Sequence, residues 1–122
     1  MALIAVVDDL FFAARIRETA RQVGVPIDIV PAAAVESRFA RLQGASESTA
    51  LIVDLNFSGA PGLIRKLKRG SKAGRFFIVG FVSHVASDLI GAAREAGCDQ
   101  VMARSAFTKQ LPELLQQLVA RP

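Results

Sequence analysis

The chain has 122 residues, of which 52% are hydrophobic, and its formal net charge is +4 with a pI near 10.0. This length predicts one domain, residues 1–122, with a single core and no room for a second module. Cys98 is the only cysteine, which excludes an intramolecular disulfide and favours a reducing, cytoplasmic compartment.

The first half of the chain predicts strands that alternate with helices. The apolar run from Leu3 to Val7 lacks polar alternation, as strands do when helices cover both faces of their sheet. This run has no basic segment before it and ends at Asp8, so it is neither a signal peptide nor a membrane span. A helix follows, with the apolar face Phe12, Ile16, Ala20 and Val23, and it ends at Gly24. The next strand runs from Pro26 to Val30, and a second helix, marked by Val35, Phe39 and Leu42, ends at Gly44. A loop from Ala45 to Thr49 then leads to a strand from Ala50 to Val53.

The second half continues the same alternation, which gives five strand–helix units and a parallel sheet covered on both faces. A loop from Ser58 to Gly62 precedes a short helix, marked by Leu63, Ile64 and Leu67, that ends near Gly70. A strand from Phe76 to Val82 is followed by a helix with Leu89, Ile90, Ala93 and Ala96 that ends at Gly97. The last two elements are a strand from Gln100 to Ala103 and an amphipathic helix with Leu111, Leu114, Leu115 and Leu118. Pro112 is compatible with the final helix only if it lies in the first turn.

Three acidic residues stand where predicted strands end. Asp8 and Asp9 follow the first strand, and Asp54 follows the third. Ligands of open parallel sheets gather beyond the carboxyl ends of the strands, so we expect these carboxylates to form one cluster. Such a cluster favours a hard divalent cation, with Mg²⁺ the expected ion. The alternative is that these acids only cap helices or turns.

The order of these motifs resembles that of the receiver domains of two-component response regulators, the CheY-like family, over nearly the whole chain. That family has an acid pair after strand one, a phosphoacceptor Asp after strand three, a Ser or Thr after strand four and a Lys after strand five. The corresponding positions here are Asp8-Asp9, Asp54 within DLNFSG, Ser83 within GFVSHV and Arg104 within GCDQVMARSAF. The resemblance implies an α/β flavodoxin-like fold, with five parallel strands in the order 2-1-3-4-5 and helices on both faces.

The resemblance also implies a role for each site residue. Asp54 would accept the phosphoryl group, while Mg²⁺ neutralises the charge on the transferred oxygens. Asp9 and Asp54 would bind the metal directly, Asp8 through water, and Asn56 through its backbone carbonyl. Ser83 would donate a hydrogen bond from its hydroxyl to a phosphoryl oxygen.

Several positions depart from the family pattern. Arg104 replaces the lysine, and its planar guanidinium favours bidentate pairing, so it is expected either to contact phosphate or to form a salt bridge with the acid cluster. His84 follows Ser83 where the family prefers a small residue, and a lone histidine favours a structural role over metal binding or phosphorelay. Val101 stands where an aromatic is frequent, and Ser105 replaces a usual proline.

Two functions follow from this pattern. The first is a response regulator that accepts phosphate on Asp54 from a histidine kinase, a phosphotransfer protein or a small phosphodonor, and then signals to a downstream protein. Its only expected activity is phosphoryl transfer to its own Asp54 and the loss of that phosphate. The alternative is a phosphorylation-independent pseudo-receiver that acts as an interaction scaffold. The final helix and its neighbouring surface could support a homodimer.

Other classes of site lack their motifs. The chain contains no GxxxxGK[ST] loop, GxGxxG turn or GxSxG elbow, which argues against a nucleotide-binding domain and a serine hydrolase. Six basic residues between Arg65 and Arg75 could contact nucleic acid or an acidic protein. We favour the interpretation that these basic residues form a solvated helix face, because no aromatic residues lie among them and no DNA-binding motif flanks them.

Overall fold

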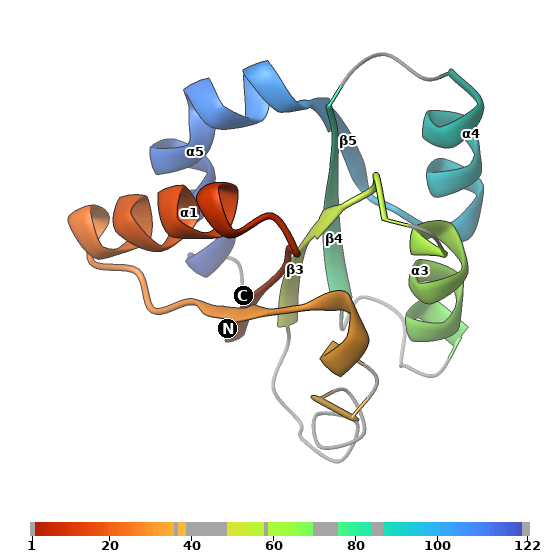
Figure 1. The fold of residues 1–122 in the computed structure, drawn as a ribbon, viewed down its shortest axis with the longest axis horizontal. Coiled ribbons are helices and arrows are strands. Elements are labelled where there is room, and N and C mark those ends of the chain that lie inside the picture. The colour runs from red at the N-terminus through yellow and green to blue at the C-terminus, as the bar shows by residue number, and fades with distance from the viewer. Residues whose placement is uncertain are drawn as a thin grey trace.

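A computed structural model describes residues 2–35, 37–38, 49–57, 59–69, 76–83 and 87–120. Within this part of the chain, five strands form one parallel sheet in the order β2-β1-β3-β4-β5 (Figure 1). This confirms the predicted fold class and strand order. The strands are β1 (Ala2–Val6), β2 (Asp28–Val30), β3 (Thr49–Asp54), β4 (Phe76–Val82) and β5 (Gln100–Ala103), and the helices are α1 (Leu10–Val23), the 3-10 turn η1 (Ala32–Ala34), α3 (Ala60–Arg69), α4 (Ser87–Ala96) and α5 (Arg104–Val119).

Helices cover both faces of the sheet. In Figure 1, α1 and α5 lie on one side, and α3 and α4 lie on the other. Successive side chains of β3 face opposite sides of the sheet, because side chains alternate in direction along a strand. Ala50 and Ile52 pack under α1 and α5, whereas Leu51 and Val53 pack under α3 and α4. Both sets are buried, which explains the absence of polar alternation in the strand sequences.

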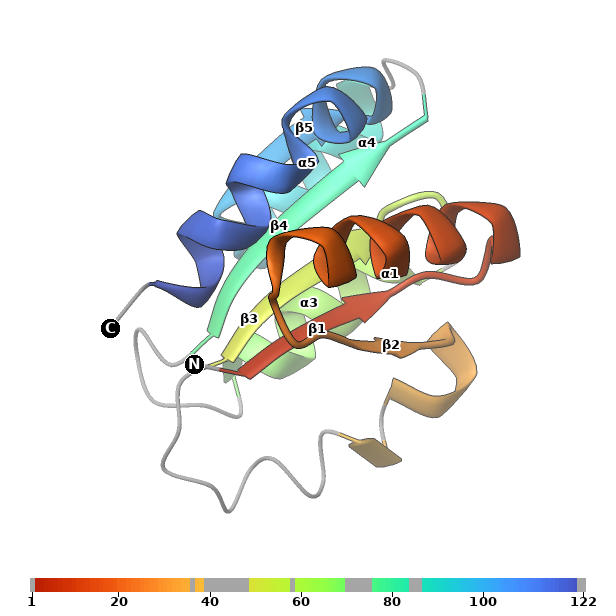
Figure 2. The ribbon, with the colours of Figure 1, turned by 90° about the vertical axis from the view of Figure 1, so that its left-hand side faces the viewer.

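Three phenylalanine rings join α1 and α5 to the middle of the sheet. Phe81 of β4 stacks on Phe107 of α5 with 4.6 Å between ring centroids, and Phe12 of α1 lies 4.9 Å from Phe81 and 5.7 Å from Phe107. Aromatic contacts at these spacings are favourable beyond the area they bury. The cluster therefore joins the first turns of both helices to β4, and Figure 2 shows α1 and α5 together on the near side of the sheet.

Gly80 provides the space for the residue that follows Asp54. A Cβ atom at Gly80 would lie 2.7 Å from Cδ1 of Leu55, which is closer than carbon atoms can approach. Leu55 is fully buried, and its backbone N–H donates to the carbonyl of Phe81 at 2.9 Å. The glycine in β4 therefore positions the turn after β3, where Asp54 stands.

The start of α3 was predicted wrongly. The segment from Ser58 to Gly62 was expected to be a loop, but α3 already begins at Ala60. Pro61 lies in its first turn, where a missing N–H costs nothing because the first-turn N–H groups have no partner inside the helix. Proline and glycine therefore suggested a loop at a position where the helix accepts them.

The position of Pro112 was also predicted wrongly. Helix α5 begins at Arg104, so Pro112 lies in its interior and not in its first turn. The helix buries Phe107, Leu111, Leu114, Leu115 and Leu118 against the sheet. This burial extends over the whole helix and outweighs the local cost of the proline.

Other boundaries shift by one or two residues. Thr49, expected to end a loop, is buried and begins β3. The first strand ends at Val6 and the second begins at Asp28, although the N–H of Val7 still donates to the carbonyl of Val30. Most of the predicted second helix, with Phe39 and Leu42, lies outside the described residues. No helix in the described ranges is long and apolar enough to cross a membrane.

Candidate functional site

The polar residues singled out in the sequence meet at one edge of the sheet. Val6 of β1 pairs with Val53 of β3, and Val82 of β4 pairs with Ala103 of β5. The residues that follow these pairs therefore leave the sheet at the same end, because all the strands are parallel. They are Asp8, Asp9, Asp54, Ser83 and Arg104.

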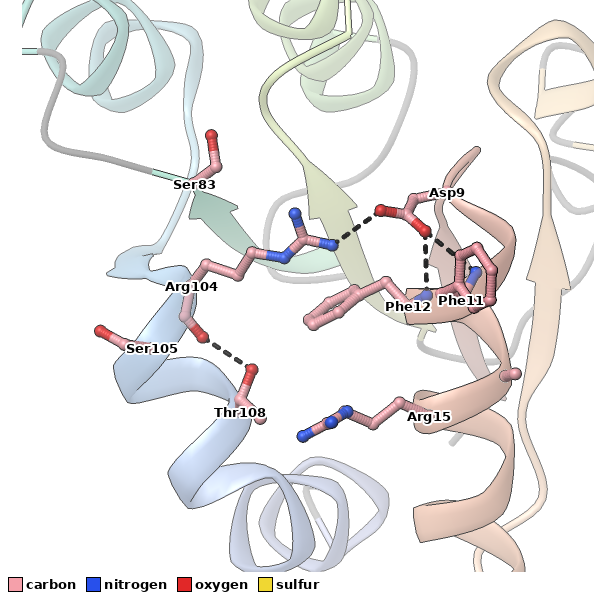
Figure 3. A pocket seen from close by; sticks show the side chains of 9 residues that line it. Asp9, Phe11, Phe12, Arg15, Ser83, Arg104, Ser105 and Thr108 are labelled. Carbon is pink, nitrogen blue, oxygen red and sulfur yellow. Dashed lines mark hydrogen bonds and ion pairs between the residues drawn. The ribbon is translucent and has the colours of Figure 1, made fainter.

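Asp9 caps helix α1 and pairs with α5. Its Oδ1 accepts hydrogen bonds from the N–H groups of Phe11 at 2.9 Å and Phe12 at 3.1 Å, which identifies it as the N-cap residue. Its Oδ2 accepts from Nη2 of Arg104 at 3.0 Å (Figure 3). The Phe12 N–H and, second, the Arg104 guanidinium hold the pKa of the Asp9 carboxyl below its usual range. Both oxygens of this carboxylate are therefore committed to protein groups.

Arg104 is held on several sides. It is the first residue of α5, and its guanidinium carbon lies 4.1 Å from the centroid of the Phe12 ring. This is the geometry of a cation–π contact. Its carbonyl accepts a hydrogen bond from the Thr108 hydroxyl at 2.8 Å. With Asp9 at its tip, the side chain takes the salt-bridge arrangement that was one of its two predicted roles.

Asp8 serves a different part of the fold. Its Oδ1 accepts a hydrogen bond from the backbone N–H of Ala32 at 2.8 Å. This bond ties the end of β1 to η1, across 24 positions of sequence. The contact fits the predicted alternative of a turn-capping acid.

Asp54, Asn56 and Ser83 form a hydrogen-bonded chain. The backbone N–H of Asn56 donates to Oδ1 of Asp54 at 2.9 Å, and its side-chain amide donates to the same oxygen at 2.8 Å. The Ser83 hydroxyl donates to Oδ1 of Asn56 at 3.1 Å. The family resemblance implies only a backbone role for Asn56, although an Asp with an Asn two positions later is a signal for this kind of turn. The Asn56 side chain therefore stands between Ser83 and Asp54.

In this arrangement each of the three acids accepts hydrogen bonds from protein groups. No group of three or more His, Cys, Asp or Glu side chains that could hold a metal occurs among the residues placed by the structure. Asp9 is occupied by two backbone N–H groups and by Arg104, and Asp8 and Asp54 each use one oxygen in a turn. A divalent cation at Asp9 would have to displace the guanidinium. The Mg²⁺ ligands inferred from the resemblance, Asp8, Asp9, Asp54 and Asn56, stay a prediction.

Part of the basic run has a structural role. Lys68 of α3 donates from Nζ to the carbonyl of Phe76 at 2.9 Å and pairs with Asp99 at 2.8 Å. Asp99 also accepts from the N–H of Ile78, so this lysine joins α3 to β4 and to the start of β5. Lys72, Arg75 and His84 lie outside the described residues.

Comparison with known proteins supports the fold at low sequence identity. No family model matches the chain, and no curated protein matches it. Among solved structures, a response regulator receiver domain from Rhodospirillum rubrum aligns with a TM-score of 0.75 at 15% identity, over 100% of this chain and 96% of that one. A response regulator receiver domain from Bermanella marisrubri aligns with a TM-score of 0.74 at 19% identity, over 97% of both chains. The Mn²⁺-bound form of the response regulator Rcp1 aligns with a TM-score of 0.73 at 13% identity, over 99% of this chain and 96% of that one. The chain therefore has the receiver fold that its motifs predicted.

Proposed function

We propose that this chain is a receiver-type signalling protein that acts by binding another protein, and that the Arg104–Asp9 ion pair holds its site in one state without phosphate. The observation that carries the proposal is the 3.0 Å contact between Nη2 of Arg104 and Oδ2 of Asp9. In the family that the motifs resemble, a lysine stands at the position of Arg104, and the second acid of the pair binds a metal. Here the guanidinium supplies a fixed positive charge beside that acid.

The surroundings of Arg104 support a permanent contact. The Phe12 ring lies under its guanidinium, and the Thr108 hydroxyl bonds to its carbonyl. A guanidinium is planar and delocalised and stacks on aromatic rings more readily than a lysine ammonium, so it loses less on leaving water. The Ser83 hydroxyl is likewise engaged, through Asn56. The groups expected to respond to a phosphoryl group are therefore already joined by protein contacts.

A second candidate function is phosphorylation on Asp54. One observation favours it: Oδ2 of Asp54 has no hydrogen-bond partner within the part of the chain that the structure describes. The Ser83 hydroxyl is linked to the same carboxylate through the side-chain amide of Asn56. The phosphate would come from a histidine kinase, a phosphotransfer protein or a small phosphodonor. One structural neighbour, the response regulator Rcp1, is a Mn²⁺-bound form, which supports binding of a divalent ion by this fold. Arg104 would then have to leave Asp9.

Intact-mass analysis after incubation with acetyl phosphate and Mg²⁺ separates the two functions. We expect the wild-type chain to stay unmodified and Arg104→Lys to gain a labile phosphate that the added change Asp54→Asn abolishes. Phosphate on the wild-type chain, lost in Asp54→Asn, would reject the first proposal in favour of the second. If Arg104→Lys also stays unmodified, Arg104 is not the cause of the missing phosphorylation.

A further inference from the structure

A pocket opens between the first turns of α1 and α5, beside the Asp9–Arg104 pair. Its volume is about 890 Å³, which is within the usual range for small-molecule sites of roughly 300–1,000 Å³. Helix α1 contributes Phe11, Phe12 and Arg15 to its wall, and α5 contributes Ser105 and Thr108. Figure 3 shows the Arg15 side chain extending from α1 toward α5.

The pocket carries one uncompensated positive charge. Two basic side chains and one acid line it, and the acid, Asp9, is neutralised by Arg104. The Arg15 side chain is exposed, and its guanidinium has no hydrogen-bond or ion-pair partner among the described residues. The Ser105 hydroxyl, although exposed, lies on the outer side of α5 and points away from Arg15 (Figure 3). The Arg15 guanidinium can bind an anionic group by itself, since its planar fork supplies both a positive charge and several N–H donors.

The pocket also offers an aromatic surface. Phe11 is 92% exposed and lines the pocket, whereas its neighbour Phe12 is buried under Arg104. A large exposed ring beside a cationic group is unusual on a solvated surface, and covering it with a second flat ring would be favourable.

We propose that this pocket binds a small organic anion that carries a flat ring. The anionic group would lie against the Arg15 guanidinium, and the ring would lie against Phe11, which stands four residues before Arg15 on the same helix face. Because Arg104 bridges the pocket and the strand-end site, a ligand here would act on the same residues that phosphorylation controls in the family this chain resembles. The proposal goes beyond the proposed function and does not depend on whether Asp54 accepts phosphate.

The shared chemistry, a ring joined to an acid group, can come from a phosphate ester or from a carboxylate. We would titrate the ¹⁵N-labelled chain with adenosine 5′-monophosphate and with 2-naphthoate and follow the amide signals by NMR. Adenosine and inorganic phosphate are the probes for the ring alone and the charge alone. We expect at least one ring-bearing anion to shift amides at the start of α1 and α5, and both single-feature probes to bind more weakly.

Matched variants locate the site. Arg15→Gln should weaken binding about tenfold, the effect of removing one charge-assisted hydrogen bond. Arg17→Gln removes an equally exposed arginine of the same helix that does not line the pocket, and should change affinity by less than about twofold. Phe11→Ala should weaken the ring-bearing probe and leave the fold intact, because the side chain is exposed.

Three outcomes would overturn the proposal. The first is that neither ring-bearing anion shifts the amides of α1 and α5. The second is that inorganic phosphate binds as tightly as they do, which would leave no role for Phe11. The third is that Arg17→Gln weakens binding as much as Arg15→Gln, which would identify a general attraction of anions to a basic surface. None of these results bears on phosphorylation of Asp54, which the mass measurement tests separately.

Discussion

Asp9 and Arg104 lie 95 positions apart in the sequence, yet the Arg104 guanidinium donates to the Asp9 carboxylate at 3.0 Å. The other oxygen of Asp9 holds the first N–H groups of α1, and Arg104 is the first residue of α5. One carboxylate therefore fixes the starts of the two helices that cover the same face of the sheet. In the family that this chain resembles, the same two positions face a metal ion and a phosphoryl group.

The pH dependence of stability provides a first test of this contact. Hydrogen bonds from α1 and from Arg104 lower the pKa of Asp9 below its ordinary value of 3.8. A lowered carboxyl pKa stabilises the fold above the ordinary value, and the stabilisation is lost as the pH falls through the lower, folded-state pKa. We expect the melting temperature of the wild-type chain to fall below about pH 4.

Asp9→Asn removes the titrating group but keeps a capping oxygen. Its melting temperature should be lower than that of the wild-type chain at neutral pH, and the difference should shrink on acidification. Asp88→Asn, an exposed acid in the first turn of α4, is the control and should keep the wild-type profile. Parallel profiles for wild type and Asp9→Asn would show that the Asp9 contacts contribute nothing to stability.

Gly80 is the position in β4 where a methyl group should be most harmful. In Gly80→Ala the new Cβ would lie 2.7 Å from the buried Leu55 side chain, and overpacking of this kind costs about 1–3 kcal/mol. Gly91→Ala is the matched change on α4, where nothing lies within 4 Å, and it should stabilise the helix by about 0.5–1 kcal/mol. Urea unfolding of the two variants should therefore show shifts of opposite sign. A neutral result for Gly80→Ala would mean that Leu55 moves aside freely.

The sequence predicted most of the fold because its signals there are local. Phe76–Val82 and Gln100–Ala103 match the predicted strands residue for residue. One error occurs at Pro61, which the first turn of α3 accepts, and another at Pro112, where burial along the whole of α5 outweighs the local rule about proline. Burial depends on tertiary contacts, which a local pattern does not contain.

The site was predictable in position but not in its contacts. Parallel strands bring Asp9, Asp54, Ser83 and Arg104 to one edge whatever the side chains then do. Whether Arg104 pairs with an acid or stays available for phosphate depends on side-chain packing, here on the Phe12 ring beneath it. The bridging role of Asn56 depends on the same level of detail. Residue types and spacing leave such choices open.

Pro112 offers a second test of stability, because it lies inside α5. Proline has no N–H, so the carbonyl of Thr108 four residues earlier lacks its usual helical partner. Pro112→Ala should stabilise the chain by up to about 3 kcal/mol, reduced by the freedom that alanine adds to the unfolded state. Pro61→Ala is the control, because Pro61 lies in the first turn of α3 and its replacement should change stability far less. Equal effects in chemical denaturation would contradict the difference between the two positions.

Cys98 should react as a buried thiol and not as a catalytic one. Burial is the main cause that raises its pKa above the ordinary 9.0, and its Sγ donates to the carbonyl of Gln100 at 3.2 Å. The thiolate is the reactive form, so we expect Ellman's reagent to modify the folded chain at pH 8 more slowly than the chain unfolded in urea.

The raised pKa of Cys98 also predicts a pH dependence of stability. An acid whose pKa is raised by folding stabilises the fold fully at pH values below its pKa in the unfolded chain. That stabilisation is lost as the pH rises through and above about 9, where the unfolded thiol ionises first. The melting temperature of the wild-type chain should therefore fall more steeply between neutral pH and about pH 10 than that of Cys98→Ala. Rapid labelling of the folded chain would instead show that the thiol is open to solvent, and would remove burial as the cause of the raised pKa.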